Sequence, residues 1–275
     1  MPYKGTNRYQ TFLKAGRTIT DKISRLNGVV GILGTGSIGR RFGDRHSDLD
    51  LIVYANREHV KNIDRLVSIG WIEYKGISYD IVVRTYEKAL KAKSPSAYWT
   101  QVMRWDRQNS QILYDSDNRI RDLLKSKLVY PDREQKKLMA RYHREIHEYL
   151  VFFPDMWATR GSLYNVVDAL GRAVQSIILW IYAKNKVFEP FISKWLFYHL
   201  EEKTIPEHIY LKTLTRVFSG RVRNLEDALR CRDELLNLCN RIGLNWEVYN
   251  LNEVSERCQK NWVKISPESH RLLTW

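Results

Sequence analysis

Cysteine and long apolar runs are the two features that this sequence has little of. Three cysteines stand among 275 residues, an odd number without Cys-x-x-Cys spacing, which favours free thiols in a reducing compartment over zinc ligands or disulfides. The longest strongly apolar stretch, residues 176–183, is far shorter than the ~20 residues that a bilayer span needs. No apolar core near the N-terminus resembles a signal peptide. We therefore expect a cytoplasmic protein without a membrane partner.

The composition excludes the disordered and fibrous classes but carries an unusual charge. Hydrophobic residues make up 44% and charged residues 28% of the chain, as in ordinary folded domains. Lys and Arg number 45 against 31 Asp and Glu, which gives a formal net charge of +14. A field of this sign attracts phosphates, nucleic acid or acidic surfaces and repels cationic ligands. A basic surface unrelated to any partner is the alternative, since no compact run of Lys and Arg resembles a nucleic-acid-binding tail.

The sequence pattern changes near residue 130. Residues 28–33, 48–54 and 111–114 read as strands, and residues 71–74 and 78–84 as the arms of a hairpin. Ser94-Pro95 reads as a helix start, with Ser as N-cap and Pro in the first turn. Beyond Pro131 long helical periods follow, over residues 138–153, 167–181 and 225–238. We expect an α+β fold in which residues 1–128 form one domain and residues 129–275 a helical bundle.

A glycine-rich turn follows the first strand. Gly34-Thr35-Gly36-Ser37 leads toward a helix, and glycines let the backbone approach a ligand while the helix N-terminus offers free N–H groups to an anion. The hydroxyl of Ser37 adds another donor. The turn therefore predicts a seat for phosphates at Gly36 and Ser37. Arg40 is a further candidate phosphate contact, with a surface-loop role as the equal alternative.

Acidic residues interrupt two otherwise apolar strands. Asp48 and Asp50 alternate along one strand, so both point to the same face, about 6.6–6.8 Å apart along the chain. Their mutual repulsion is relieved by a divalent cation, and hard oxygen ligands suit Mg²⁺ or Mn²⁺. Asp80 stands inside another apolar strand and joins this cluster if the two strands are neighbours. Three carboxylates beside a phosphate seat describe a two-metal phosphoryl-transfer site.

These residues together resemble the polymerase-β-like nucleotidyltransferase superfamily over about residues 28–84. The resemblance rests on the glycine–serine turn, the ten intervening residues, Asp48-Leu49-Asp50-Leu51 and the later strand aspartate. It implies a small mixed sheet backed by helices, with Asp48 and Asp50 binding two Mg²⁺ ions and Ser37 with its turn holding the nucleotide phosphates. Asp80 would be the third carboxylate, either a metal ligand or a base for the acceptor hydroxyl. Some members of the superfamily have lost catalysis, but all three carboxylates are present here, which favours an active enzyme.

The order of the two parts is similar to that of the antibiotic nucleotidyltransferases, including the streptomycin/spectinomycin and lincosamide enzymes. That resemblance implies that a lysine of the helical part contacts the triphosphate, with Lys194 as first and Lys186 as second candidate and a purely solvated role as the alternative. Tyr164, Asp168 and Arg172 follow one another at spacings of four, which places them on one side of a helix. They are candidates for acceptor binding, with Asp168 as a possible base. A solvated Asp168–Arg172 ion pair is the equal alternative.

The sequence therefore predicts a Mg²⁺-dependent nucleotidyltransferase. It would move a nucleoside monophosphate, in the first place AMP from ATP, to a hydroxyl of a small molecule and release pyrophosphate. Trp99 and Trp105 are candidates to stack on the base. RNA and protein acceptors stay open, and a non-catalytic nucleotide- or RNA-binding module is the alternative from another class. The acceptor, the preferred base and the oligomeric state are not determined by the sequence.

Overall fold

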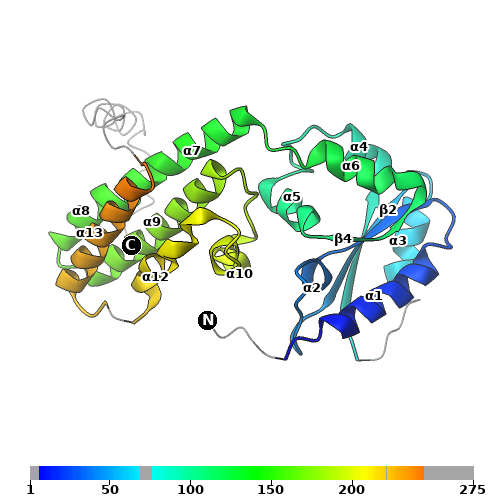
Figure 1. The fold of residues 1–275 in the computed structure, drawn as a ribbon, viewed down its shortest axis with the longest axis horizontal. Helices are drawn as coiled ribbons and strands as arrows, with labels where there is room; N and C mark the ends of the chain where they lie inside the picture. The colour runs from blue at the N-terminus through cyan, green and yellow to red at the C-terminus, as the bar shows by residue number, and fades with distance from the viewer. Residues whose placement is uncertain (1–5, 69–75, 221, 245–275) are drawn as a thin grey trace, which may run out of the picture. The chain divides into compact units, whose positions relative to one another are not determined.

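The structure is a computed structural model that describes residues 6–68, 76–220 and 222–244 (Figure 1). The chain divides into two compact units, one comprising residues 1–142 and 178–206 and the other residues 143–177 and 207–275. The first unit thus takes in more of the chain than the expected catalytic domain of residues 1–128, because it also includes residues 129–142 and 178–206. The assignment of functional domains at a boundary between residues 128 and 129 stays a prediction.

A four-stranded mixed sheet forms the centre of the first unit. Its strands are β1 (Val29–Gly34), β2 (Leu49–Ala55), β3 (Tyr79–Thr85) and β4 (Gln111–Asp115), in the order β3-β2-β1-β4. β1 is antiparallel to β2 and to β4, whereas β2 and β3 are parallel. The expected α+β fold with a small mixed sheet is confirmed, and β4 lies at one edge of the sheet. The first arm of the expected hairpin, residues 71–74, lies outside the described residues.

Helices cover both faces of this sheet (Figure 1). α1 (Tyr9–Ile23) and α3 (Val60–Ser68) pack against one face, where they meet Leu49, Leu51 and Val53 of β2. α4 (Tyr86–Lys91) and α6 (Arg119–Lys127) pack against the other face, where Ile52 and Tyr54 are buried. Because successive side chains of a strand point to opposite faces, the even-numbered residues of β2 share the face covered by α4 and α6. That face carries the candidate site.

Helix α5 (Gln101–Gln108) begins later than the sequence suggested. The prediction that Ser94-Pro95 starts a helix is wrong, since the segment from residue 92 to residue 100 is not helical. Thr100 is the N-cap instead, and its hydroxyl accepts the backbone N–H of Met103 at 3.2 Å. A threonine satisfies a free N–H of the first turn much as a serine does. The helix thus has a hydroxyl N-cap of the expected kind, but at Thr100 and not at Ser94.

The remaining elements are mostly helical. The first unit also contains the short helices α2 (Gly36–Gly39), η1 (Ser116–Asn118), α10 (Ile192–Trp195) and α11 (Tyr198–Glu201). α7 (Asp132–Ile146) and α9 (Leu163–Lys184) contribute residues to both units, and η3 (Pro206–Tyr210) begins at the last residue of the first. The second unit contains η2 (His147–Phe152), α8 (Phe153–Ala158), α12 (Leu211–Leu214), η4 (Arg216–Phe218) and α13 (Leu225–Arg241). The three long helical periods of the sequence are thus found as helices.

Among the described residues, α9 is the one helix long and apolar enough to cross a membrane by length and composition. Within its most apolar window, however, 72% of the residues are buried in the structure, as in the core helix of a folded protein. Cys231 and Cys239 are free and buried, and burial raises the pKa of the Cys231 thiol to about 11. Two of the three predicted free thiols are confirmed, and Cys258 lies outside the described residues.

Candidate active site

A cavity of 490 Å³ lies within the first unit, against the sheet face that α4 and α6 cover. Residues of β2, β3, the turn at α2, α5 and α10 line it. Elements from widely separated parts of the chain therefore meet at one place, and the charged side chains among them define the chemistry of the site.

Three carboxylates reach the cavity from two neighbouring strands. Asp48 directly precedes β2, and the parallel register pairs Asp50 of β2 with Asp80 of β3. Burial first, and then the charges of Asp48, Asp106 and Asp80, raise the pKa of Asp50 to about 6, while Arg40 acts in the opposite sense. The structure thus brings together the three carboxylates that the sequence pattern grouped.

A fourth carboxylate, Asp106, was not identified from the sequence. It lies on α5 and lines the same cavity. Burial raises the pKa of Asp106, whereas the charges of Arg107 and Arg40 and the backbone N–H of Gly36 oppose this shift. No local pattern marks this residue, because only the packing of α5 against α2 and α6 turns it toward Asp50.

The turn after β1 requires a glycine at one position. Gly36 has φ of +49°, and a Cβ there would lie 1.7 Å from Oδ2 of Asp50, so only glycine lets the backbone pass this carboxylate. Ser37 has a different place from the one expected. It is buried, its hydroxyl donates to the backbone carbonyl of Asp48 at 3.0 Å, and it is not among the residues that line the cavity. The Ser37 hydroxyl therefore fixes the turn against the start of β2.

Arg40 follows α2 and lines the cavity. Its Cζ lies 4.1 Å from the ring centroid of Trp195, and its Nε is buried without a hydrogen-bond partner. Burial lowers the pKa of Arg40, and the charges of Asp50 and Asp106 are the largest of those that raise it. Arg40 is thus a half-buried cation facing carboxylates, rather than the surface-loop residue that the sequence left open.

The two candidate lysines are in different environments. Lys194, on α10, lines the cavity. Lys186 lies elsewhere in the first unit, where its ammonium group binds Oδ1 of Asp132 at 2.7 Å. The structure therefore brings Lys194, and not Lys186, to the carboxylates.

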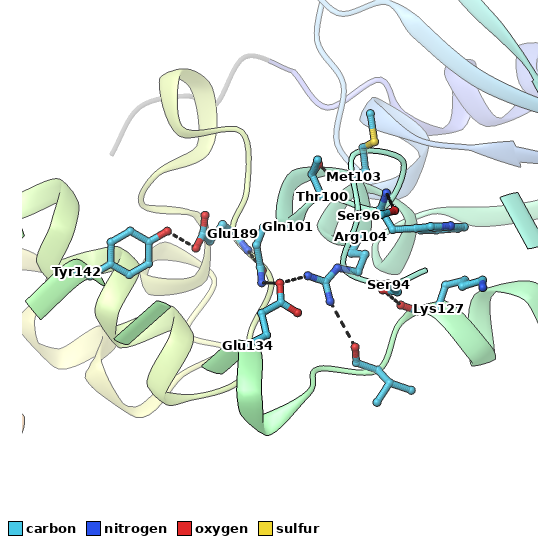
Figure 2. Close-up of polar contacts among 12 residues, drawn as sticks. Ser94, Ser96, Thr100, Gln101, Met103, Arg104, Lys127, Glu134, Tyr142 and Glu189 are labelled. Carbon is cyan, nitrogen blue, oxygen red and sulfur yellow. Dashed lines mark hydrogen bonds and ion pairs between the residues drawn. The ribbon is translucent and has the colours of Figure 1, made fainter. Parts of the chain in front are cut away.

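A buried polar network fastens the segment before α10 to α5 (Figure 2). Arg104 of α5 is fully buried and pairs with Glu134 of α7. Gln101 donates to Glu134 at 2.8 Å and accepts the backbone N–H of Glu189 at 3.3 Å. Tyr142 donates to the carboxylate of Glu189. Because α5 and α10 both line the cavity, the network fixes two of its walls relative to each other.

The tryptophans divide between core and cavity. Trp99 is fully buried and its Nε1 donates to the carbonyl of Ala89 at 3.1 Å, so it packs and does not face the cavity. Trp105 lines the cavity, edge-on to Tyr198 with centroids 5.3 Å apart. Trp195 of α10 lines it as well.

The residues expected to bind the acceptor belong to the second unit. Tyr164 is 79% exposed, and Asp168 accepts from Nε of Arg172 at 2.9 Å. Arg172 also lies over the ring of Tyr149, with Cζ 5.6 Å from its centroid. This is the solvated ion pair that the sequence left open, and a role of these residues in acceptor binding stays a prediction.

The carboxylates fit a hard divalent cation. Within the described part of the chain, no group of three or more Asp, Glu, His or Cys side chains forms a ready-made metal site. Mg²⁺ is nevertheless bound in many phosphoryl-transfer sites by one or two carboxylates, with substrate phosphates and water completing its octahedron. Asp48 and Asp50 supply such a pair. The raised pKa of Asp50 reflects first its burial and then the charges of the neighbouring carboxylates, and a cation would neutralise those charges.

Comparison with known proteins supports the class that this geometry suggests. Residues 17–101 match the family model described as a nucleotidyltransferase domain, a range that contains the glycine turn and all three predicted carboxylates. No curated protein matches the chain. Similar solved structures include a nucleotidyltransferase-like protein from Exiguobacterium sibiricum, with 13% identity, a TM-score of 0.42 and coverage of 82% of this chain and 74% of that one. Another is spectinomycin adenyltransferase AAD(9) from Enterococcus faecialis with ATP and spectinomycin, with 12% identity, a TM-score of 0.34 and coverage of 82% and 98%.

The chain thus contains a nucleotidyltransferase domain over residues 17–101. The motif, the mixed sheet and the family match over residues 17–101 agree on this class.

Proposed function

We propose that the protein transfers a nucleoside monophosphate, in the first place AMP from ATP, to a hydroxyl of a small-molecule acceptor and releases pyrophosphate, with Mg²⁺ as the metal. The observation that carries this proposal is the convergence in one cavity of Asp48, Asp50 and Asp80 with the cations Arg40 and Lys194. Carboxylates for the metal and cations for a triphosphate are the two things that nucleotidyl transfer needs.

Asp48 and Asp50 would hold the metal, as one of two Mg²⁺ ions or with Mn²⁺ in its place. When bound, such an ion supplies charge neutralisation and lowers the pKa of an attacking hydroxyl. Asp80, paired with Asp50 across the strands, either completes the metal site or accepts the proton of the acceptor hydroxyl. For either role the side chain must be accessible from the cavity, and Asp80 is exposed and lines it.

The triphosphate would lie at the end of the cavity where Gly36, Arg40 and Lys194 meet the carboxylates. Arg40 offers a planar guanidinium that is already oriented by stacking on Trp195, and an oriented donor loses less entropy when it binds a phosphate. Ser37 contributes indirectly, since its hydroxyl holds the backbone of Asp48. Positioning and charge neutralisation are the main sources of rate in phosphoryl transfer.

The test compares Asp50→Asn with wild type and with Asp64→Asn, an exposed aspartate of α3 outside the cavity. Each protein is incubated with Mg²⁺, labelled nucleoside triphosphates and a cell extract, and both pyrophosphate and the labelled product are measured. We expect Asp50→Asn to lose metal-dependent pyrophosphate release while Asp64→Asn keeps it. Full activity of Asp50→Asn would refute the assignment.

The same experiment separates the other functions. Label in RNA would favour an RNA acceptor, for which the net charge of +14 is the supporting observation. Label in protein would favour a protein acceptor. Calorimetry that finds tight binding of ATP with Mg²⁺, without turnover on any acceptor, would favour a non-catalytic binding module.

A further inference from the structure

The charge of the cavity reverses along the parallel strand pair. The register of β2 with β3 pairs Asp50 with Asp80, and two residues further along each strand it pairs Ile52 with Val82. A third pair, Tyr54 with Arg84, follows after another two residues. Because alternate residues share a face, an acidic row, an apolar row and a basic row follow one another along one sheet face.

Arg84 is a cation without a counter-ion at the basic end. It lines the cavity, and among residues 6–68, 76–220 and 222–244 no hydrogen bond or ion pair holds its guanidinium group. An arginine in this setting has its donors available to a ligand, and its planar fork matches the oxygens of a phosphate or a carboxylate.

Arg107 brings a second guanidinium to the same cavity from α5. Its Nε donates to the hydroxyl of Tyr54 at 3.1 Å and its Nη1 to the carbonyl of Met103 at 2.9 Å, while Cζ lies 5.2 Å from the ring centroid of Trp99. The charge of Arg107 lowers the pKa of the neighbouring Asp106, so Asp106 partly neutralises this cation. Arg107 is therefore a fixed cation, held beside the Tyr54–Arg84 row.

Tyr98 adds a hydroxyl without a partner. Its hydroxyl oxygen is buried and makes no hydrogen bond, although a buried hydroxyl normally has one. Burial and the neighbouring Tyr54 raise the pKa of Tyr98, while Arg84 and Arg107 lower it. The phenol therefore feels the charge of both guanidinium groups, but Tyr98 is not among the residues that line the cavity, so the two arginines are the groups that a ligand there would meet.

We propose that Arg84, with Arg107 beside it, binds an anionic group of a small-molecule acceptor, a phosphate or a carboxylate. This inference rests on the proposed function. Four residues of a parallel strand span about 13 Å, so the anionic group would lie several bonds away from the hydroxyl that reacts beside Asp50 and Asp80. The cavity volume of 490 Å³ is in the range of small-molecule sites.

The main competitor for Arg84 is the nucleotide itself, so the nucleotide site is filled first. Wild-type protein with saturating Mg²⁺ and a non-hydrolysable ATP analogue is titrated calorimetrically with inorganic phosphate. Arg84→Gln is compared with Arg84→Lys and with Arg121→Gln, an exposed arginine of α6. We expect Arg84→Gln to weaken phosphate binding about ten- to hundredfold, Arg84→Lys to restore part of it, and Arg121→Gln to leave it unchanged.

A transfer assay then identifies the acceptor class. We expect wild type to label the monophosphate ester of a polyol better than the polyol itself, and Arg84→Gln to lose this preference. Unchanged phosphate binding in Arg84→Gln would overturn the proposal, as would an equal loss of affinity for the ATP analogue, which would assign Arg84 to the nucleotide. Label in an oligonucleotide but not in the polyol phosphate would overturn it in favour of a nucleic-acid acceptor. Failure of wild type to bind the analogue would count against the proposed function instead.

Discussion

The buried pair of Arg104 and Glu134 allows a quantitative prediction. The side chain of Arg104 is 0% exposed and that of Glu134 is 10% exposed, so Glu134→Gln leaves a guanidinium charge inside the protein. Removing one partner of a buried pair costs about 3–5 kcal/mol of unfolding free energy. We expect a value near the lower end, about 3 kcal/mol, because the Arg104 cation also lies over Phe188, with Cζ 4.5 Å from the ring centroid.

Urea unfolding followed by tryptophan fluorescence measures this loss. With a urea dependence of about 2 kcal/mol per M for a unit of this size, the midpoint of the first unit falls by about 1–2 M. Arg104→Met is expected to cost a similar amount, since it leaves the Glu134 carboxylate with Gln101 as its remaining partner. The double variant removes both charges, so its loss is expected to be smaller than the sum of the single losses.

A matched control lies on the same helix. Asp132 pairs with Lys186, but the side chains of the two are 76% and 48% exposed, and exposed pairs contribute little because water screens them. Asp132→Asn is therefore expected to shift the midpoint far less than Glu134→Gln. Strictly additive losses in the Arg104–Glu134 cycle, or equal shifts for the buried and the exposed pair, would show that burial of the charge does not set the cost.

Three further predictions concern the site and its surroundings. Gly36→Ala is expected to abolish nucleotidyl transfer, because its Cβ would lie 1.7 Å from Oδ2 of Asp50; activity within a fewfold of wild type would contradict this. Lys194→Ala is expected to weaken nucleotide binding about tenfold in a calorimetric titration, whereas Lys186→Ala is expected to leave it unchanged. Burial lowers the pKa of His199 from 6.5 to about 4, so between these pH values the unfolded chain binds a proton that the folded protein does not. The free energy of unfolding is therefore unaffected by His199 titration above pH 6.5 and falls by about 3 kcal/mol as the pH falls to 4. The unfolding free energy of His199→Gln, measured across this pH range, should lack this decrease. An identical pH dependence in wild type and variant would refute the prediction.

The parts of the site that depend on strand periodicity could be predicted from the sequence. Asp50 and Asp80 each interrupt an apolar strand pattern, and Asp48 directly precedes one of these strands; a shared polar site accounts for all three. Side chains two residues apart on a strand share a face, and this alternation, which grouped Asp48 with Asp50, also applies along β3 from Asp80. It places Arg84, four residues later, on the same face, so a signal for the basic row was present in the sequence.

The parts that depend on tertiary packing could not be predicted in this way. Asp106 lies on a short helix whose orientation is set by its contacts with α2 and α6. Lys186 and Lys194 have the same chemistry and stand eight residues apart in the sequence. The path of the chain brings Lys194 to the cavity and Lys186 to Asp132. The hydroxyl of Ser37 was expected to face a phosphate, and the structure shows it on the backbone carbonyl of Asp48.

The net charge of the chain is a poor guide to what the cavity binds. Four acidic and four basic side chains line it, namely Asp48, Asp50, Asp80, Asp106, Arg40, Arg84, Arg107 and Lys194, so the excess of +14 is carried by residues outside this lining. The arrangement of the charges decides the ligand instead. Cations interspersed with carboxylates at one end suit a metal–triphosphate, while a guanidinium without a carboxylate partner at the other end suits an isolated anion. A polycationic acceptor would have to place positive charge beside Arg84. The repulsion between these two positive charges would weaken its binding, whereas a neutral acceptor would not meet this repulsion.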